Sequence, residues 1–156
     1  MTGTGLRAGG VDEATLRATV DLAWVTLLGD EPVAAPADEV RDAVRASISI
    51  SLEGADGVTV VVEMEPGLAV LSAAALLGVE PDDLDDAAIE DAVGEIANVV
   101  GGNLKGAMGD EACALSLPVV THGPAPASAG DPTAEVGSRL GGFPVRWRVH
   151  EGVVGG

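Results

Sequence analysis

The chain has 156 residues and a mass of 15.5 kDa, and 47% of its residues are apolar, which is the size and composition of one folded domain. Eight basic residues against 25 acidic ones give a net charge of −17, which argues against binding to nucleic acid or anionic lipid through a basic surface. The single cysteine, Cys113, excludes an internal disulfide, and no apolar run approaches the roughly 20 residues that span a bilayer. We therefore expect a cytoplasmic protein whose partners are neither nucleic acid nor membrane.

The periodicity of the apolar residues predicts an α+β domain over residues 11–151, with flexible tails at 1–10 and 152–156. Helices are expected over 11–28, 66–77 and 87–108. Strands are expected over 46–52, 58–64, 112–117, 133–140 and 143–150, and the first two are expected to form a β-hairpin. The predicted order is therefore α-β-β-α-α-β-β-β, with loops at 30–39 and 122–132 and an acidic connection at 80–86.

The last predicted strand has apolar residues on one face and a charged stripe, Arg146, Arg148 and His150, on the other. Such a stripe is typical of a sheet edge that charge protects from pairing, or of a surface that meets an acidic partner. We favour the edge.

The predicted helix 87–108 has two unlike faces. Its buried stripe is expected to be centred on Ile96 and to include Ile89, Ala92, Val93, Val99, Val100 and Ala107. Asn103 points toward the same side and is expected to be a buried structural hydrogen-bonding residue rather than a catalytic one. The opposite face holds Asp91, Gly94, Glu95, Asn98, Gly101, Gly102 and Lys105.

Three glycines on one helix face are unfavourable, since each costs roughly 0.5–1 kcal/mol relative to alanine. They leave the backbone bare, so that a second surface can approach beside Glu95 and Asn98, which are neighbours on the helix. The alternative is a solvated face whose glycines reflect composition only.

Two segments resemble the signature regions of the CheX/CheC chemotaxis phosphatases: residues 89–106, IEDAVGEIANVVGGNLKG, and residues 115–123, LSLPVVTHG. The family motif is an acidic residue, then Glu-x-x-Asn, then a proline, and here these are Asp91, Glu95, Asn98 and Pro118. CheC-like members carry two such helices. The first helix here has no Glu-x-x-Asn, so the chain is identified as a CheX-like member.

The resemblance implies a CheC-like fold, with long helices on a mixed or antiparallel sheet, and hydrolysis of the aspartyl phosphate of a CheY-type response regulator in chemotaxis or two-component signalling. Asn98 would orient the attacking water, and Glu95 would dock to a lysine of the regulator. The partner would supply Mg²⁺, so no cofactor or metal of the chain's own is expected. Asp91, Gly94, Gly101 and Gly102 would form the docking surface, and a homodimer is also implied.

Two other functions stay open at this point: a non-catalytic dimeric adaptor that binds a response regulator, and a component related to the flagellar switch. A metal loop at Asp82, Asp83, Asp85 and Asp86 is disfavoured, because these residues lack the glycine and the ligand spacing of an EF-hand. They are expected to cap the following helix and to interact with its dipole.

Overall fold

The structure, a computed structural model, describes residues 11–53, 55–109, 112–123 and 130–152. The predicted tails therefore lie outside the described residues, apart from Gly152. Its helices are α1 (Glu13–Leu28), α2 (Pro66–Leu77) and α3 (Asp86–Met108), with a short 3-10 turn η1 (Pro81–Asp83) before α3. Its strands are β1 (Val33–Ala35), β2 (Val44–Leu52), β3 (Ala55–Met64), β4 (Ala112–Leu115), β5 (Val119–His122), β6 (Ala134–Leu140) and β7 (Phe143–Glu151).

The strands form one antiparallel sheet in the order β1-β6-β7-β3-β2-β4, and β5 also pairs with β2. The predicted α+β class and the β2–β3 hairpin are confirmed. Two short strands were not predicted, because β1 lies in a proline-containing segment expected to be a loop and β5 begins directly after Pro118.

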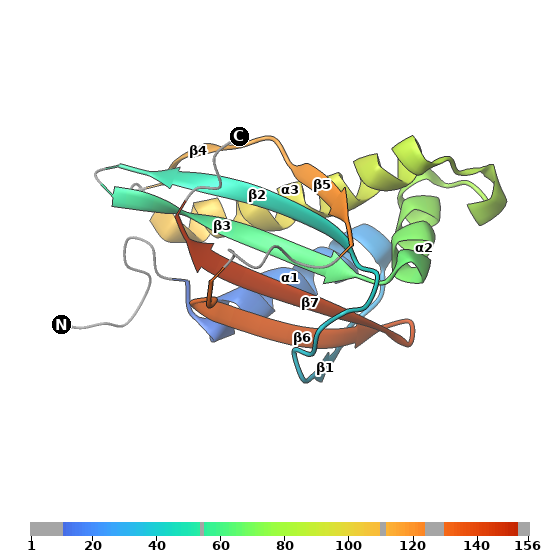
Figure 1. The fold of residues 1–156 in the computed structure, drawn as a ribbon, viewed down its shortest axis with the longest axis horizontal. Helices are drawn as coiled ribbons and strands as arrows, with labels where there is room; N and C mark the ends of the chain where they lie inside the picture. The colour runs from blue at the N-terminus through green and yellow to red at the C-terminus, as the bar shows by residue number, and fades with distance from the viewer. Residues whose placement is uncertain (1–10, 54, 110–111, 124–129, 153–156) are drawn as a thin grey trace.

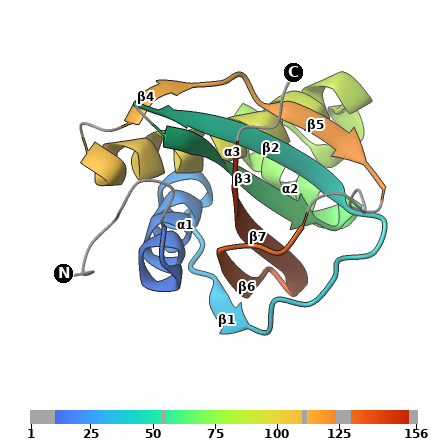
Figure 2. The same cartoon turned by 60° about the vertical axis from the view of Figure 1, so that its left-hand side comes forward.

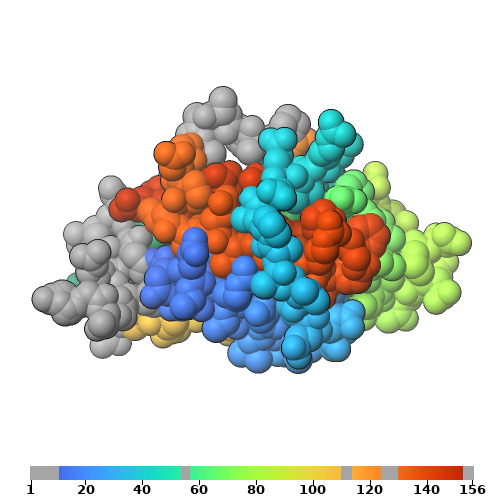
Figure 3. Space-filling view, turned by 90° about the horizontal axis from the view of Figure 1, so that it is seen from below, coloured from blue at the N-terminus to red at the C-terminus, as the bar shows by residue number. Residues whose placement is uncertain are grey.

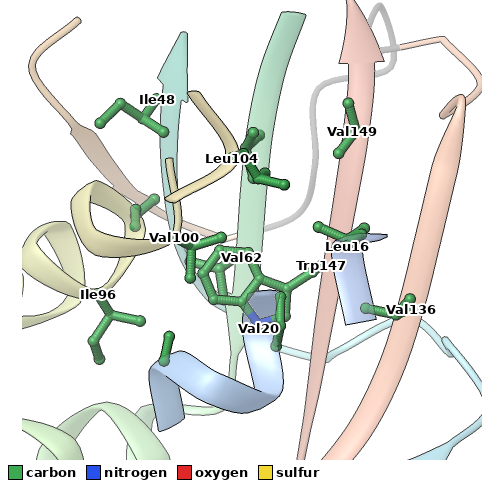
Figure 4. Packing of buried hydrophobic residues seen from close by; sticks show 14 of the residues in the cluster. Leu16, Val20, Ile48, Val62, Ile96, Val100, Leu104, Val136, Trp147 and Val149 are labelled. Atoms are coloured by element: carbon green, nitrogen blue, oxygen red, sulfur yellow. The ribbon is translucent and has the colours of Figure 1, made fainter. Parts of the chain in front are cut away.

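The helices cover one face of this sheet. Figures 1 and 2 show α1 and α3 side by side on that face, with α2 at one end. The core between the layers is built from α1, α3 and the inward residues of the central strands (Figure 4). At its centre the rings of Trp24 and Trp147 meet edge to face, with centroids 6.5 Å apart.

Side-chain and glycine caps fix where the helices begin and end. Asp12 accepts a hydrogen bond from the Thr15 amide at 2.8 Å, and Asp85 accepts one from the Ala88 amide at 2.8 Å. Gly29 ends α1 with a φ of 72°, which glycine adopts without strain. The capping role predicted for the acidic connection is therefore confirmed for Asp85, and this cap sets where α3 starts.

The opposite, outer face of the sheet is crossed by a strap, residues 36–43, which links β1 to β2. Figure 3 shows this segment as part of a cyan band across the orange and red atoms of β6 and β7. The strap lies so close to β6 that a Cβ on Gly137 would come within 2.6 Å of the Cα of Ala37. The sheet is thus covered by helices on one face and partly by its own connection on the other.

Strand β7 lies between β6 and β3, so the prediction that its charged stripe guards a sheet edge is wrong. Alternation shows that one face of the strand is polar, but it does not show whether the strand has a neighbour on each side. The charged side chains instead form ion pairs with the neighbouring strands on the outer face of the sheet. Arg146 pairs with Glu63 of β3, and Arg148 pairs with Glu135 of β6.

Candidate functional site

Helix α3 buries a wide face against the sheet and the neighbouring helices. The buried residues are Ala92, Val93, Gly94, Ile96, Ala97, Val100, Gly101, Leu104 and Met108. The centre of this face is rotated by roughly 70° from Ile96 toward Leu104, at 100° per residue. Asn103 and Ala107, both predicted to point into the core, lie in the last two turns of α3 and are exposed, so those two predictions are wrong.

Two of the three helix glycines are covered by the chain itself. A Cβ on Gly101 would lie 2.8 Å from Cγ2 of Ile48, and a Cβ on Gly94 would lie 3.3 Å from Cγ of Pro118. Gly94 and Gly101 are therefore buried beneath the edge of the sheet, and the prediction that they form part of a bare docking surface is wrong. Both glycines lie within a quarter-turn of the rotated centre of the buried face, and for that reason they are covered.

The third glycine matches its prediction. A Cβ on Gly102 would have no heavy atom within 4 Å, so the backbone is open there. Asp91 and Glu95 are exposed and Asn98 is half-buried on the same side of α3. These four residues, which we call the α3 outer face, form one continuous surface along the helix.

The polar groups of the α3 outer face are left without a partner by the described residues. In the part of the chain that the structure describes, no hydrogen bond or ion pair engages the side chains of Asp91, Glu95 or Asn98. Asn98 offers both a donor and an acceptor, and Glu95 offers two acceptor oxygens. Such a pair can hold a water on the amide and a cation on the carboxylate at the same time.

Beside this face, the edge of the sheet is interrupted between β4 and β5. Both strands pair with β2, and Ser116 bridges the gap by donating its amide to the Ser49 carbonyl at 2.9 Å and accepting from the Ser49 amide at 2.9 Å. Pro118 has no amide proton and cannot continue the ladder. The break sets Pro118 over Gly94, which lies one helical turn before Asn98.

The same break exposes apolar side chains. Leu117 is 86% exposed and Val119 is 56% exposed, next to the proline of the motif. This surface was not predicted, because Leu117 was expected to be the last residue of the strand over 112–117. Proline at the next position was the signal that could have revealed it.

A further contact ties β5 to α3. His122 Nε2 lies 2.9 Å from Glu90 Oε2, with both side chains about half exposed. His122, expected at the start of a loop, is thus the last residue of β5 and helps to hold that strand beside the α3 outer face.

Neither a metal centre nor a membrane segment is found among the described residues. Within the ranges given above, no group of three or more His, Cys, Asp or Glu side chains is arranged to hold a metal ion. In the same ranges no helix is both long and apolar enough to cross a bilayer.

No curated protein sequence matches the chain. Solved structures do share its fold. A CheX chemotaxis protein from Vibrio vulnificus superposes with a TM-score of 0.71 at 19% identity, covering 93% of this chain and 99% of that one. CheX in a CheX–CheY–BeF3–Mg²⁺ complex from Borrelia burgdorferi gives 0.69 at 14% identity, covering 92% and 100%. FliY from Thermotoga maritima gives 0.53 at 12% identity, covering 87% and 84%.

At these identities the structural matches establish the fold, and the sequence match establishes the family. The family model described as "Chemotaxis phosphatase CheX" matches residues 46–134, more than half of the chain, and this range contains most of β2 and all of β3, α3 and the β4–β5 edge. The chain belongs to the CheX family.

Proposed function

We propose that this protein hydrolyses the aspartyl phosphate of a CheY-type response regulator. The observation that carries the proposal is the pair Glu95 and Asn98, one turn apart on an outward surface of α3 and free of partners in the described part of the chain. The family membership supports it, as does the similar Borrelia burgdorferi CheX, whose solved structure is a complex with CheY, BeF3 and Mg²⁺.

In this mechanism Asn98 orients the attacking water. An acyl phosphate is already reactive, so the missing element is a water held in line with the bond to be broken. A carboxamide has no useful pKa and does not act as a base, but it can accept one hydrogen bond from a water and donate another to it. The Mg²⁺ that neutralises the phosphoryl oxygens comes with the regulator.

Glu95 docks the regulator by accepting a hydrogen bond from a lysine beside its phosphoryl group. A charge-assisted hydrogen bond of this kind strengthens when the contact excludes water. Gly102 favours that exclusion, because the open backbone there lets a partner surface approach the helix. Asp91, on the same face, adds a negative charge at the rim of the contact.

The exposed Leu117 and Val119 supply an apolar part of the same docking surface. Large apolar side chains exposed beside unpaired polar groups are typical of the centre of a protein interface. They compensate for the chain's strongly negative charge, which does not favour long-range attraction to an acidic partner.

The adaptor function uses the same surface without catalysis, whereas the match to FliY shows a shared fold and does not support the flagellar-switch function. The presence of both Glu95 and Asn98 favours the phosphatase, because docking alone has no need of an amide that can hold water. A homodimer is compatible with all three functions.

The test is the loss of phosphate from radiolabelled response regulators of the source organism, with and without the purified chain, in the presence of Mg²⁺. The proposal expects decay faster than the regulator's own rate for at least one regulator. A regulator that binds tightly yet decays at its own rate would favour the adaptor instead.

A further inference from the structure

A cavity of about 250 Å³ lies on the outer face of the sheet, on the side opposite to α3. The strap covers it with Glu39, Val40, Arg41 and Asp42, and the sheet forms its floor with Arg45, Glu63 and Arg146. The proposed phosphatase site makes no use of these residues.

The floor of the cavity holds one buried cation, Arg45, one partly buried cation, Arg146, and one buried anion, Glu63. The Glu63 side chain is 2% exposed, and its Oε2 accepts from Nε and Nη2 of Arg45 at 2.9 and 2.7 Å. Its Oε1 accepts from Nε and Nη2 of Arg146 at 2.7 and 2.5 Å. One carboxylate therefore balances one of two guanidinium groups, and one positive charge is left over.

The lining as a whole also holds Glu39, Arg41 and Asp42, which makes three arginines and three carboxylates, so the surplus of one positive charge belongs to the floor alone. Glu39 and Asp42 are exposed at the rim and form no ion pair with either arginine. A partly desolvated guanidinium group without a counter-ion of its own favours the binding of an added anion.

Both arginines also have donors to spare. Each guanidinium holds Glu63 by its Nε–Nη2 edge, and its Nη1 group donates to no described residue. A guanidinium carries five N–H donors in a planar fork that matches a carboxylate or phosphate group. The unused donors belong to residues that line the cavity.

The strap backbone is held in an unusual conformation at this point. Asp42 has a φ of 51° and is the one non-glycine residue with a positive φ in the described ranges. Aspartate tolerates this region better than most residues, but the conformation still costs energy and is frequent at ligand-binding sites. This unusual backbone conformation therefore occurs at a residue of the strap that covers the cavity.

We propose that this cavity binds a small soluble oxyanion, through a phosphate or carboxylate group held by Nη1 of Arg45 and Nη1 of Arg146. Arg41 of the strap contributes a third positive charge at the mouth. The volume is several times the roughly 30 Å³ of a water molecule, so a ligand larger than a single ion fits. Solvent screens Glu39, Arg41 and Asp42 alike at the mouth, so the two arginines of the floor contribute most to binding.

The experiment is isothermal titration of the full chain with sodium phosphate and, separately, with sodium malonate, each against sodium chloride at matched ionic strength. The proposal expects saturable binding of one equivalent of phosphate, malonate or both, and the arm that saturates identifies the preferred group. Saturation with neither anion would overturn it.

Three variants test where the anion sits. Arg146→Gln leaves Glu63 in a neutral pair with Arg45, so affinity is expected to fall about tenfold or more. Arg41→Gln, at an exposed position, is expected to weaken binding severalfold without affecting the fold. Arg139→Gln is the matched control, because Arg139 lies on the same face but outside the cavity lining and donates to the Gly142 carbonyl.

Unchanged affinity in folded Arg146→Gln, or equal losses in Arg139→Gln and Arg41→Gln, would overturn the proposal. If Arg146→Gln does not fold, Arg41→Gln against Arg139→Gln decides it. These outcomes are independent of the phosphatase, because none of the variants touches α3.

Discussion

On the outer face of the sheet Glu63 is 2% exposed and held by two arginines, whereas Glu95 on α3 is exposed and has no described partner. Both are glutamates on elements that pack into the same domain. Glu63 is committed to the fold, since its charge is desolvated and its oxygens are satisfied. Glu95 remains solvated and available, so replacing it costs the fold little and costs a partner much. The comparison distinguishes charged side chains that stabilise the fold from those that are available to bind a partner.

The largest effect on stability is expected from Glu63→Ala. It leaves the buried guanidinium group of Arg45 and the partly buried one of Arg146 without their carboxylate, which costs about 3–5 kcal/mol of unfolding free energy. Glu135→Ala is the control, because the Arg148–Glu135 pair is more exposed and worth less than about 1 kcal/mol. Urea unfolding measures both. Equal losses would show that the two pairs do not differ as their burial indicates.

The two glycines of the pair Gly101 and Gly102 are expected to respond in opposite ways. Gly101→Leu collides with Ile48 and Leu115, and such overpacking costs about 1–3 kcal/mol. Gly102→Leu enters open space, so the fold should be unaffected while binding of the regulator weakens. Unfolding curves and a binding titration on each variant give both readouts. Loss of stability in Gly102→Leu would contradict the assignment of its open surface.

Leu117→Ser tests the apolar part of the docking surface. Removing a side chain that is 86% exposed should change stability by less than about 0.5 kcal/mol. Binding of the regulator should weaken about tenfold, since burying a leucine at an interface is worth about 1.5–3 kcal/mol. Val33→Ser is the control, because Val33 is 68% exposed on β1, at the opposite edge of the sheet. Similar binding losses in both variants would point to a general surface effect.

The smallest effect is expected from pH and His150. Burial, and secondly the nearby Arg148, lower the pKa of His150. As the pH falls, His150 binds a proton near pH 6.5 in the unfolded chain but only at a lower pH in the folded chain. Its contribution to stability is therefore full above about pH 6.5 and is lost as the pH falls through the folded pKa. His150→Gln should therefore lose less stability than the wild type between pH 7.5 and 5.5 in urea unfolding. Identical losses would remove His150 as the cause.

The family and most elements could be predicted from the sequence because they depend on local patterns. The cap and apolar period of α3, the Gly29 and Gly78 stops and the β2–β3 alternation are all readable within a few residues. The position of β7 inside the sheet could not be predicted, because strand order depends on pairing between segments that are distant in the sequence.

Within the candidate site, residues whose position depends only on the helix were placed correctly, and residues whose position depends on distant strands were not. Glu95, Asp91 and Gly102 lie on the predicted side of α3, with Asn98 half-buried beside them. Gly94 and Gly101 do not, because they are covered by Pro118 and by Ile48, which are distant along the chain, and the sequence of the helix gives no sign of what packs on it. Leu117 was missed for the complementary reason: its exposure follows from the break between β4 and β5.

The central claim is that Asn98 holds the attacking water while the rest of the α3 outer face holds the partner. The direct measurement is the decay of the phosphorylated regulator with Asn98→Ala, alongside its affinity for the regulator and circular dichroism as a folding control. We expect the rate to fall by about two orders of magnitude or more with binding largely intact, whereas Glu95→Ala should weaken both. A folded Asn98→Ala variant that dephosphorylates the regulator at the wild-type rate would contradict the account.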